Sequence, residues 1–212
     1  ANTSAEVLDR SGNANHGDAV NGPTGVPGKQ GQGMSFDGSD DYIQINSQVI
    51  SDSQGTIGVW IKPESLSGEM IDHIVYVGNG DGLGSDDELH LSYSDDQEAT
   101  AYFGSGIGNG LQYEIAGGDV PLKEWSYLTF SYYNNNYLKL YVNGAMVAST
   151  TMEGVVESDD WRSYVTIGRC LNEVERYYDG QIDQVRIYDR VLSESEIQQL
   201  YDLGSRKIQI TQ

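Results

Sequence analysis

Short runs in which apolar and polar residues alternate are the dominant pattern along this chain. Segments 42–45 and 89–93 show it clearly, with every second side chain apolar. A period of two is typical of β-strands that bury one face, so each run predicts a strand. Further runs of this kind lie at 56–61, 99–103, 125–133, 137–142, 145–148, 165–167 and 182–188. Together they predict an all-β protein, a sandwich or jelly roll of antiparallel strands.

One turn in this series can be assigned from its residue types. Asn143-Gly144 stands between two alternating runs. Asn-Gly is the pair best suited to the positive φ angles of a two-residue hairpin turn. Segments 138–142 and 145–148 are therefore expected to pair with each other.

A single helix is predicted near the end of the chain. Ser193 and Glu196 have the spacing of a capping box, in which each side chain bonds the backbone N–H of the other residue. A short apolar stripe follows within residues 197–201. Gly204 is the expected end of the helix, because glycine is common just beyond the last turn.

Charge excludes several classes of partner. The 212 residues include 32 acidic and 12 basic ones, which gives a formal net charge of −20. A surface this acidic repels phosphate groups, so we expect neither nucleic-acid binding nor adsorption to anionic membranes. No segment is long and apolar enough to insert into a membrane.

Composition favours a folded domain with many turns. Aromatic residues make up 10% of the chain, which argues against disorder although only 38% of residues are hydrophobic. The 26 glycines indicate many turns and bulges. The only cysteine, Cys170, excludes an intrachain disulfide and is interpreted as a small apolar residue at a strand end.

Six motifs follow one another along the chain: DRSGNANHG (9–17), GQGMSFDG (31–38), TIGVWIKP (56–63), LKLYVNG (138–144), VTIGR (165–169) and DGQIDQVRIY (179–188). In this order they resemble the LamG-like jelly-roll domain of the concanavalin A-like lectin/glucanase superfamily. The resemblance implies a single domain over residues 1–212, a two-sheet antiparallel jelly-roll sandwich with one short C-terminal helix. The eight residues before Asp9 do not look like the strand that usually opens this domain, and the alternating segment 207–212 is a candidate to replace it.

The sequence does not contain the catalytic patterns of the superfamily's enzymes. The Glu-x-Asp-x-Glu arrangement of its glycanases is absent, and the acidic clusters 86–88 and 173–175 are interpreted as solvated loops. His73 and His90 lie in strand-like segments without a catalytic motif, so we interpret them as packed residues. We therefore expect no enzyme activity.

Calcium is the expected cofactor. Residues 37–41 concentrate carboxylate oxygens at a turn, and calcium prefers six to eight such hard ligands. The resemblance implies a structural calcium near this junction, with Asp183 beside it in the last strand. Asp37, Asp40 and Asp183 are the predicted ligands. The alternative is that Asp37-Gly38 only forms a turn and Asp183 only accepts backbone hydrogen bonds.

The expected function is a non-catalytic carbohydrate-binding module of a secreted polysaccharide-degrading enzyme or of a surface adhesin. Its ligand would be a polysaccharide or glycan, a neutral one given the net charge, and its neighbours would be other domains of a larger extracellular protein. The alternative is a protein-interaction or spacer domain of a cell-surface protein, and a divergent glycanase or lyase is a third reading. Loops and the concave face supply the predicted ligand-binding residues, which are Tyr76, Asp81, His90, Tyr102, Trp161 and Arg169.

Overall fold

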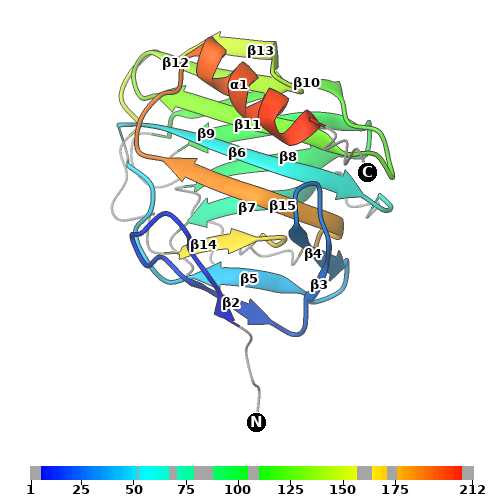
Figure 1. Ribbon diagram of the computed structural model, residues 1–212. Helices are drawn as coiled ribbons and strands as arrows, with labels where there is room; N and C mark the ends of the chain where they lie inside the picture. Colours follow the sequence, from blue (N-terminus) through cyan, green and yellow to red (C-terminus); the bar gives the residue numbers. More distant parts are fainter. Residues whose placement is uncertain are drawn as a thin grey trace.

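The alternation of apolar and polar residues produces a structure that consists mainly of β-strands, with one helix. The computed structural model describes residues 6–51, 53–66, 71–78, 88–104, 110–156, 164–170 and 176–206. Fifteen strands and one helix form in those ranges (Figure 1). They are β1 (Glu6–Val7), β2 (Gly17–Val20), β3 (Thr24–Pro27), β4 (Gln32–Asp37), β5 (Tyr42–Ile45), β6 (Gln54–Pro63), β7 (Ile71–Gly78), β8 (Glu88–Ser94), β9 (Glu98–Gly104), β10 (Gln112–Asp119), β11 (Ser126–Tyr133), β12 (Tyr137–Val142), β13 (Ala145–Thr151), β14 (Tyr164–Ile167), β15 (Asp179–Tyr188) and α1 (Glu194–Ser205).

The strands form two sheets in which neighbouring strands run antiparallel. The eight-stranded sheet has the order β1-β2-β5-β14-β7-β8-β9-β10, and the seven-stranded sheet has the order β13-β12-β11-β6-β15-β4-β3. Strands adjacent in the sequence often lie in different sheets, as β4 and β5 do, which is typical of a jelly roll. The predicted fold class is confirmed, and so is the hairpin at Asn143-Gly144, which joins β12 to β13.

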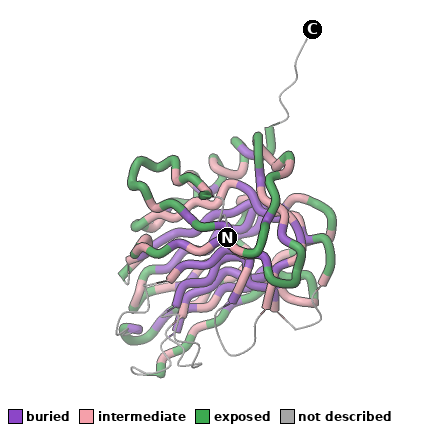
Figure 2. Tube along the Cα trace, turned by 90° about the horizontal axis from the view of Figure 1, so that it is seen from below, coloured by how far each residue is buried: buried purple, intermediate pink, exposed green. Residues whose placement is uncertain are grey.

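The main hydrophobic core lies between the two sheets. Val59 and Phe130 from one sheet and Leu91 from the other have no exposed surface. Figure 2 shows buried residues along the middle of the strands and exposed residues in the connections and at the margins. Because side chains alternate along a strand, the residues between these core positions lie on the two outer faces of the sandwich.

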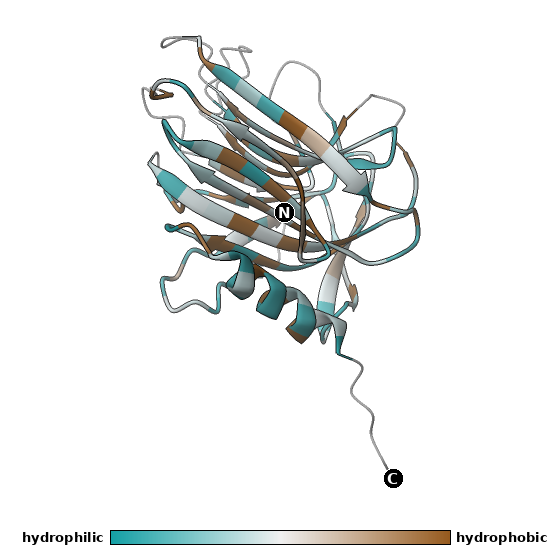
Figure 3. Cartoon of the chain, turned by 90° about the horizontal axis from the view of Figure 1, so that it is seen from above, coloured by the Kyte–Doolittle hydropathy of each residue, from teal (hydrophilic) through white to brown (hydrophobic). Residues whose placement is uncertain are grey.

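Helix α1 lies against the outer side of the seven-stranded sheet (Figures 1 and 3). The capping box at Ser193 and Glu196 is confirmed. The predicted end at Gly204 is wrong, because the helix continues to Ser205. Gly204 has a packing role instead. A side chain there would collide with the indole of Trp60, which stacks on Tyr201 with ring centroids 5.6 Å apart.

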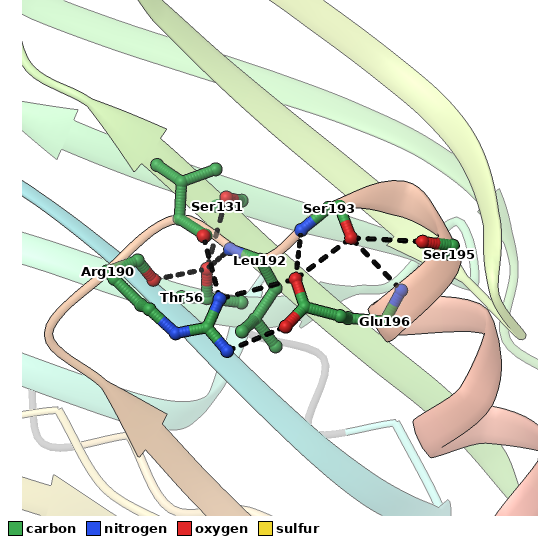
Figure 4. A network of polar contacts seen from close by, with 8 residues as sticks. Thr56, Ser131, Arg190, Leu192, Ser193, Ser195 and Glu196 are labelled. Carbon is green, nitrogen blue, oxygen red and sulfur yellow. Dashed lines mark hydrogen bonds and ion pairs between the residues drawn. The ribbon is translucent and has the colours of Figure 1, made fainter.

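A polar network attaches the segment before the helix to the sheet (Figure 4). The buried hydroxyl of Thr56 accepts a hydrogen bond from the backbone N–H of Leu192 and donates one to the carbonyl of Arg190, both at 3.0 Å. The Arg190 guanidinium in turn contacts the Glu196 carboxylate at 2.7 Å. Thr56 therefore satisfies two backbone groups of a segment far away in the sequence.

Several elements of the sheets differ from the sequence expectation. The segment before Asp9 was not expected to form a strand, but β1 pairs with β2 there. The proposed replacement, 207–212, lies outside the described residues. The strands β2, β3, β4 and β10 were not predicted, because glycines and polar residues interrupt the alternation in most of them. The strand-like segment around His73 is confirmed as β7.

Removing the hydroxyl of Thr56 tests the network. In Thr56→Val, the carbonyl of Arg190 and the N–H of Leu192 lose a partner at a buried position, which costs about 1–3 kcal/mol of unfolding free energy. Denaturant titration of the parent and the variant measures this loss. Thr24→Val, at an exposed position of the edge strand β3, is the control and should change stability little. Equal stability of Thr56→Val and the parent would show that the network does not hold the helix.

Candidate ligand-binding face

One row of side chains crosses the outer face of the eight-stranded sheet. Its members stand opposite one another in consecutive strand pairs, at positions that alternate with core residues such as Val75 and Leu91. No cross-strand partner in this row is a large aliphatic residue. The row, called the outer row below, consists of Asp18, Gln44, Thr166, Tyr76, His90, Tyr102 and Glu114.

Four aromatic rings pack together at the centre of the outer row. His90 stacks on Tyr102 with ring centroids 5.1 Å apart and an interplanar angle of 14°. His73 meets His90 edge to face at 4.5 Å and Tyr76 at 5.9 Å. We call these four residues the His-Tyr cluster.

A bulge brings His73 to this face. The register between β7 and β8 shifts between His73 and Val75, so that His73 stands opposite Ser92. In a regular strand without a bulge, His73 and Val75 would be two residues apart and would point to the same side of the sheet. Val75 is buried in the core, whereas His73 contacts Tyr76 and His90. The bulge thus completes the His-Tyr cluster.

Both histidines of the cluster are buried and uncharged. His73 is 2% exposed and His90 is 6% exposed. Burial, and then the positive charge of Arg176, lowers the pKa of His90 to about 3. The pKa of His73 also lies well below its ordinary value, because of burial and the nearby His90 and Arg176. At neutral pH each ring therefore offers one hydrogen-bond donor and one acceptor.

Ring nitrogens of the two histidines have no hydrogen-bond partner among the described residues. They are Nδ1 of His73 and both nitrogens of His90. Oε1 of Glu88 lies 3.6 Å from Nδ1 of His90, which is too far for a hydrogen bond. Buried polar groups usually have partners, so these nitrogens require an explanation outside the described part of the chain.

Two arginines, Arg169 and Arg176, follow strand β14 in the sequence. The guanidinium of Arg169 lies over the ring of Tyr42 at 4.7 Å and over the ring of Tyr177 at 5.5 Å. A β-bridge between Arg169 and Tyr177 fixes this arrangement, and Thr166 donates a hydrogen bond of 2.7 Å to the carbonyl of Arg169. The charge of Arg176 acts on both histidines. The face therefore combines aromatic rings with cationic and neutral hydrogen-bonding groups.

The structure brings several predicted ligand residues together. Tyr76, His90 and Tyr102 are neighbours in the outer row, and Arg169 follows strand β14 of the same sheet. Asp81 and Trp161 lie outside the described residues. Sequence reasoning missed the contribution of His73 and Arg176, because no spacing rule shows that a bulge turns His73 toward this face. His90 is buried, as its interpretation as a packed residue implied.

An acidic cluster lies at the end of β4. Oxygens of Asp37, Asp40 and Asp41 lie within 4.8 Å of one another. The carboxylate of Asp37 accepts hydrogen bonds from the N–H groups of Ser39 and Asp40 at 2.9 and 3.3 Å. Asp41 is buried, and burial together with the charges of Asp37 and Asp40 raises its pKa. The charged form of Asp41 is therefore destabilised, whereas hydrogen bonds, first from the N–H of Ser39, lower the pKa of Asp37.

The prediction that Asp183 joins this cluster is wrong. In the pairing of β15 with β4, Asp179 stands opposite Asp37, and Asp183 lies further along the strand. The Asp183 carboxylate instead accepts hydrogen bonds from the N–H groups of Gln30 and Gln184 at 2.8 and 2.7 Å. It therefore holds the loop between β3 and β4, and Asp41 takes the third position in the acidic cluster.

Comparison with known families identifies the fold. A family model described as the concanavalin A-like lectin/glucanases superfamily matches residues 37–198. This range contains every strand from β5 to β15 and the beginning of α1. The chain belongs to this superfamily. The resemblance stated from the sequence motifs is thus confirmed, and the concanavalin A-like sandwich accounts for the two antiparallel sheets.

Three solved structures share this fold. Domain 4 of AbnA, a GH43 extracellular arabinanase from Geobacillus stearothermophilus, was solved with arabinotriose; it is 23% identical, with a TM-score of 0.65, over 85% of this chain and 81% of that one. The CBM40 of the Ruminococcus gnavus IT-sialidase, bound to α2,3 sialyllactose, is 22% identical with a TM-score of 0.62. The match covers 70% of this chain and 83% of that one. The binding domain of Paraclostridial Mosquitocidal Protein 1 is 18% identical with a TM-score of 0.71. The match covers 92% of this chain and 49% of that one.

These likenesses concern the fold of the concanavalin A-like domain. No curated protein sequence matches the chain. Within the described ranges, no helix has the length and apolar character needed to cross a membrane.

The buried histidines predict acid sensitivity. The folded state keeps His90 neutral down to about pH 3, whereas in the unfolded chain it takes up a proton below its ordinary pKa of 6.5. Stability is therefore complete above pH 6.5 and is lost as the pH falls from there toward 3. Between pH 7 and pH 5, His90 alone accounts for a loss of about 2 kcal/mol.

His90→Gln removes this proton uptake, so its loss of stability between pH 7 and pH 5 should be smaller than the parent's by about that amount. Denaturant titrations at the two pH values measure the difference. His16→Gln, at an exposed position, is the control and should keep the parent's acid sensitivity. An unchanged pH dependence in His90→Gln would contradict the burial of a neutral imidazole.

Proposed function

We propose that this domain is a non-catalytic carbohydrate-binding module and that its glycan lies on the outer row. The observation that supports the proposal is the His-Tyr cluster. It places buried imidazole nitrogens without partners in the described part of the chain beside tyrosine rings. Tyr102 is only half-buried, so its ring is the accessible aromatic surface of the cluster. Aromatic rings and adjacent hydrogen-bonding groups are the combination that sugar rings require.

The chemistry of the cluster favours hydroxyl groups, and hence a neutral glycan. A neutral imidazole has one donor and one acceptor, and a hydroxyl can satisfy either. A carboxylate or sulfate only accepts hydrogen bonds, so it would leave the acceptor nitrogens of His73 and His90 unpaired. The net charge of −20 acts in the same direction, because it repels anionic polysaccharides at long range.

The arrangement of carboxylates supports binding without catalysis. The two acidic members of the outer row, Asp18 and Glu114, are on β2 and β10, six strand spacings apart. That separation is roughly 29 Å, whereas retaining glycosidases need carboxylates about 5 Å apart. The histidines stay neutral, and Oε1 of Glu88 lies 3.6 Å from Nδ1 of His90, beyond hydrogen-bonding distance.

The setting we propose is extracellular, as one module of a larger protein. Its support is that the fold recurs in a domain of an extracellular arabinanase and in sialidase and toxin binding domains. A secreted polysaccharide-degrading enzyme or a surface adhesin would both fit. The toxin domains keep a second possibility open, a domain that binds a protein receptor or acts as a spacer.

A glycan array followed by calorimetry tests the proposal. We expect a neutral oligosaccharide to bind, and His90→Ala and Tyr102→Ala to weaken binding about 10- to 100-fold, because each removes 1–3 kcal/mol of contact. Tyr133→Ala is the matched control, since Tyr133 is 44% exposed on the other sheet. The proposal fails if the first two variants bind like the parent. Release of reducing ends from any polysaccharide would instead indicate an enzyme.

We further propose that calcium stabilises the domain through the acidic cluster. Asp37, Asp40 and Asp41 supply the hard oxygen ligands that calcium prefers. The raised pKa of Asp41 supports this, because a buried carboxylate beside two others gains most from a bound cation. Asp37 and Asp40 are ligands predicted from the sequence, and Asp41 replaces Asp183.

Calcium at about 100 times its dissociation constant should raise Tm by roughly 5–10 °C. Asp41→Asn should abolish most of this response. In the presence of a chelator, the same variant should be more stable than the parent at neutral pH, because ionised Asp41 is unfavourable in the folded state. Asp96→Asn, in the exposed turn between β8 and β9, is the control and should keep the full response. A Tm that changes with neither calcium nor chelator would support the alternative that Asp37-Gly38 only forms a turn.

A further inference from the structure

Two glycines lie directly beneath the tyrosines of the His-Tyr cluster. In β9, a Cβ at Gly104 would lie 2.5 Å from the hydroxyl oxygen of Tyr102 and 2.7 Å from its Cζ. In β7, a Cβ at Gly78 would lie 2.6 Å from the hydroxyl oxygen of Tyr76. Real Cβ atoms do not approach so closely. Each tyrosine ring therefore lies down along its own strand, over the bare backbone of the glycine two residues later.

The two pairs are arranged alike around β8. Both have the sequence Tyr-x-Gly at the end of a strand, in segments 76–78 and 102–104. In the sheet register, His90 stands between the two tyrosines, and Glu88 stands opposite Gly104. Both phenol hydroxyls are thus directed to the same edge of the cluster, on either side of β8.

The inclination of Tyr102 determines what the face presents. Because its ring lies flat, it stacks on His90 at an angle of 14° and leaves part of its surface exposed. A ring standing upright from the sheet would lose this stack on His90. The glycine below the ring is therefore as important for the shape of the face as the ring itself.

We infer that Gly104 and Gly78 are positioning residues of the ligand-binding face, which act through Tyr102 and Tyr76. The inference rests on the proposed function. Neither glycine has a positive φ angle, so an alanine there meets no backbone strain. The three heavy atoms nearest to the added Cβ all belong to the tyrosine side chain and not to backbone, so the ring is the group that has to shift. Alanine should consequently move the ring without unfolding the protein.

The first arm of the test needs no ligand. The chain has three histidines, so the ring protons of His90 can be resolved by NMR. The ring current of the stacked Tyr102 displaces these signals, and Gly104→Ala should change them while those of His16 stay in place. Gly25→Ala is the control, since its Cβ meets only the flexible end of Gln32 on β4. Unchanged His90 signals in Gly104→Ala would overturn the inference.

The second arm measures affinity for the neutral oligosaccharide selected by the array. Gly104→Ala should weaken binding at least 10-fold, about as much as Tyr102→Ala, with a Tm close to that of the parent. In the double variant the second substitution should add almost no further loss, because the glycine acts through a ring that is already absent. Fully additive losses, or parent-like binding of Gly104→Ala beside a weak Tyr102→Ala, would refute the positioning role.

The two arms separate this inference from the proposed function. If the His90 signals move but Tyr102→Ala binds like the parent, the glycan does not use this face, and the proposed function fails while the placement of the ring stands. The same comparison of single and double variants can be made at the second pair with Gly78→Ala and Tyr76→Ala. Agreement between the two pairs would show that both glycines shape the same face.

Discussion

Burial of one apolar face of each sheet is the constraint on which the remaining structure depends. A shift of one residue in any strand would move its apolar side chains to the outside, so burial fixes the register of every strand pair. The same register aligns Tyr76, His90 and Tyr102 across three strands of the outer face. The candidate binding face is thus a consequence of core packing, and it needs no loop to hold its central residues in line.

The regular part of this architecture could be predicted from the sequence. Strict alternation in segments such as 56–61 and 89–93 identifies strands, and Asn143-Gly144 identifies a hairpin, because both signals are local. The same alternation indicates which residues share a face, so His90 and Tyr102 could be selected as neighbours of a ligand. Their contact could not, because it depends on which strands pair.

The features that sequence reasoning missed all depend on distant contacts. The bulge at Ile74 turns His73 to the outer face. The hydrophobic pattern of the neighbouring residues does not indicate that an extra residue is present. Gly204 looks like a helix end but is required where the helix approaches Trp60. Asp183 was placed beside Asp37 from the family topology, yet the register puts Asp179 there. Irregular positions of this kind are often found at functional or closely packed sites.

The polar contact of Thr56 and the ring nitrogens of the His-Tyr cluster differ in a way that bears on function. Beneath the segment that leads into α1, the buried hydroxyl of Thr56 is matched to backbone groups of Arg190 and Leu192, as a purely structural contact should be. In the His-Tyr cluster, three buried ring nitrogens lack such partners in the described part of the chain. An unsatisfied buried group costs about 1–3 kcal/mol. Folding already excludes water from His73 and His90, so part of the desolvation free energy of ligand binding has been spent before the ligand arrives. A sugar hydroxyl that forms the missing hydrogen bonds would therefore stabilise the complex relative to the unliganded protein.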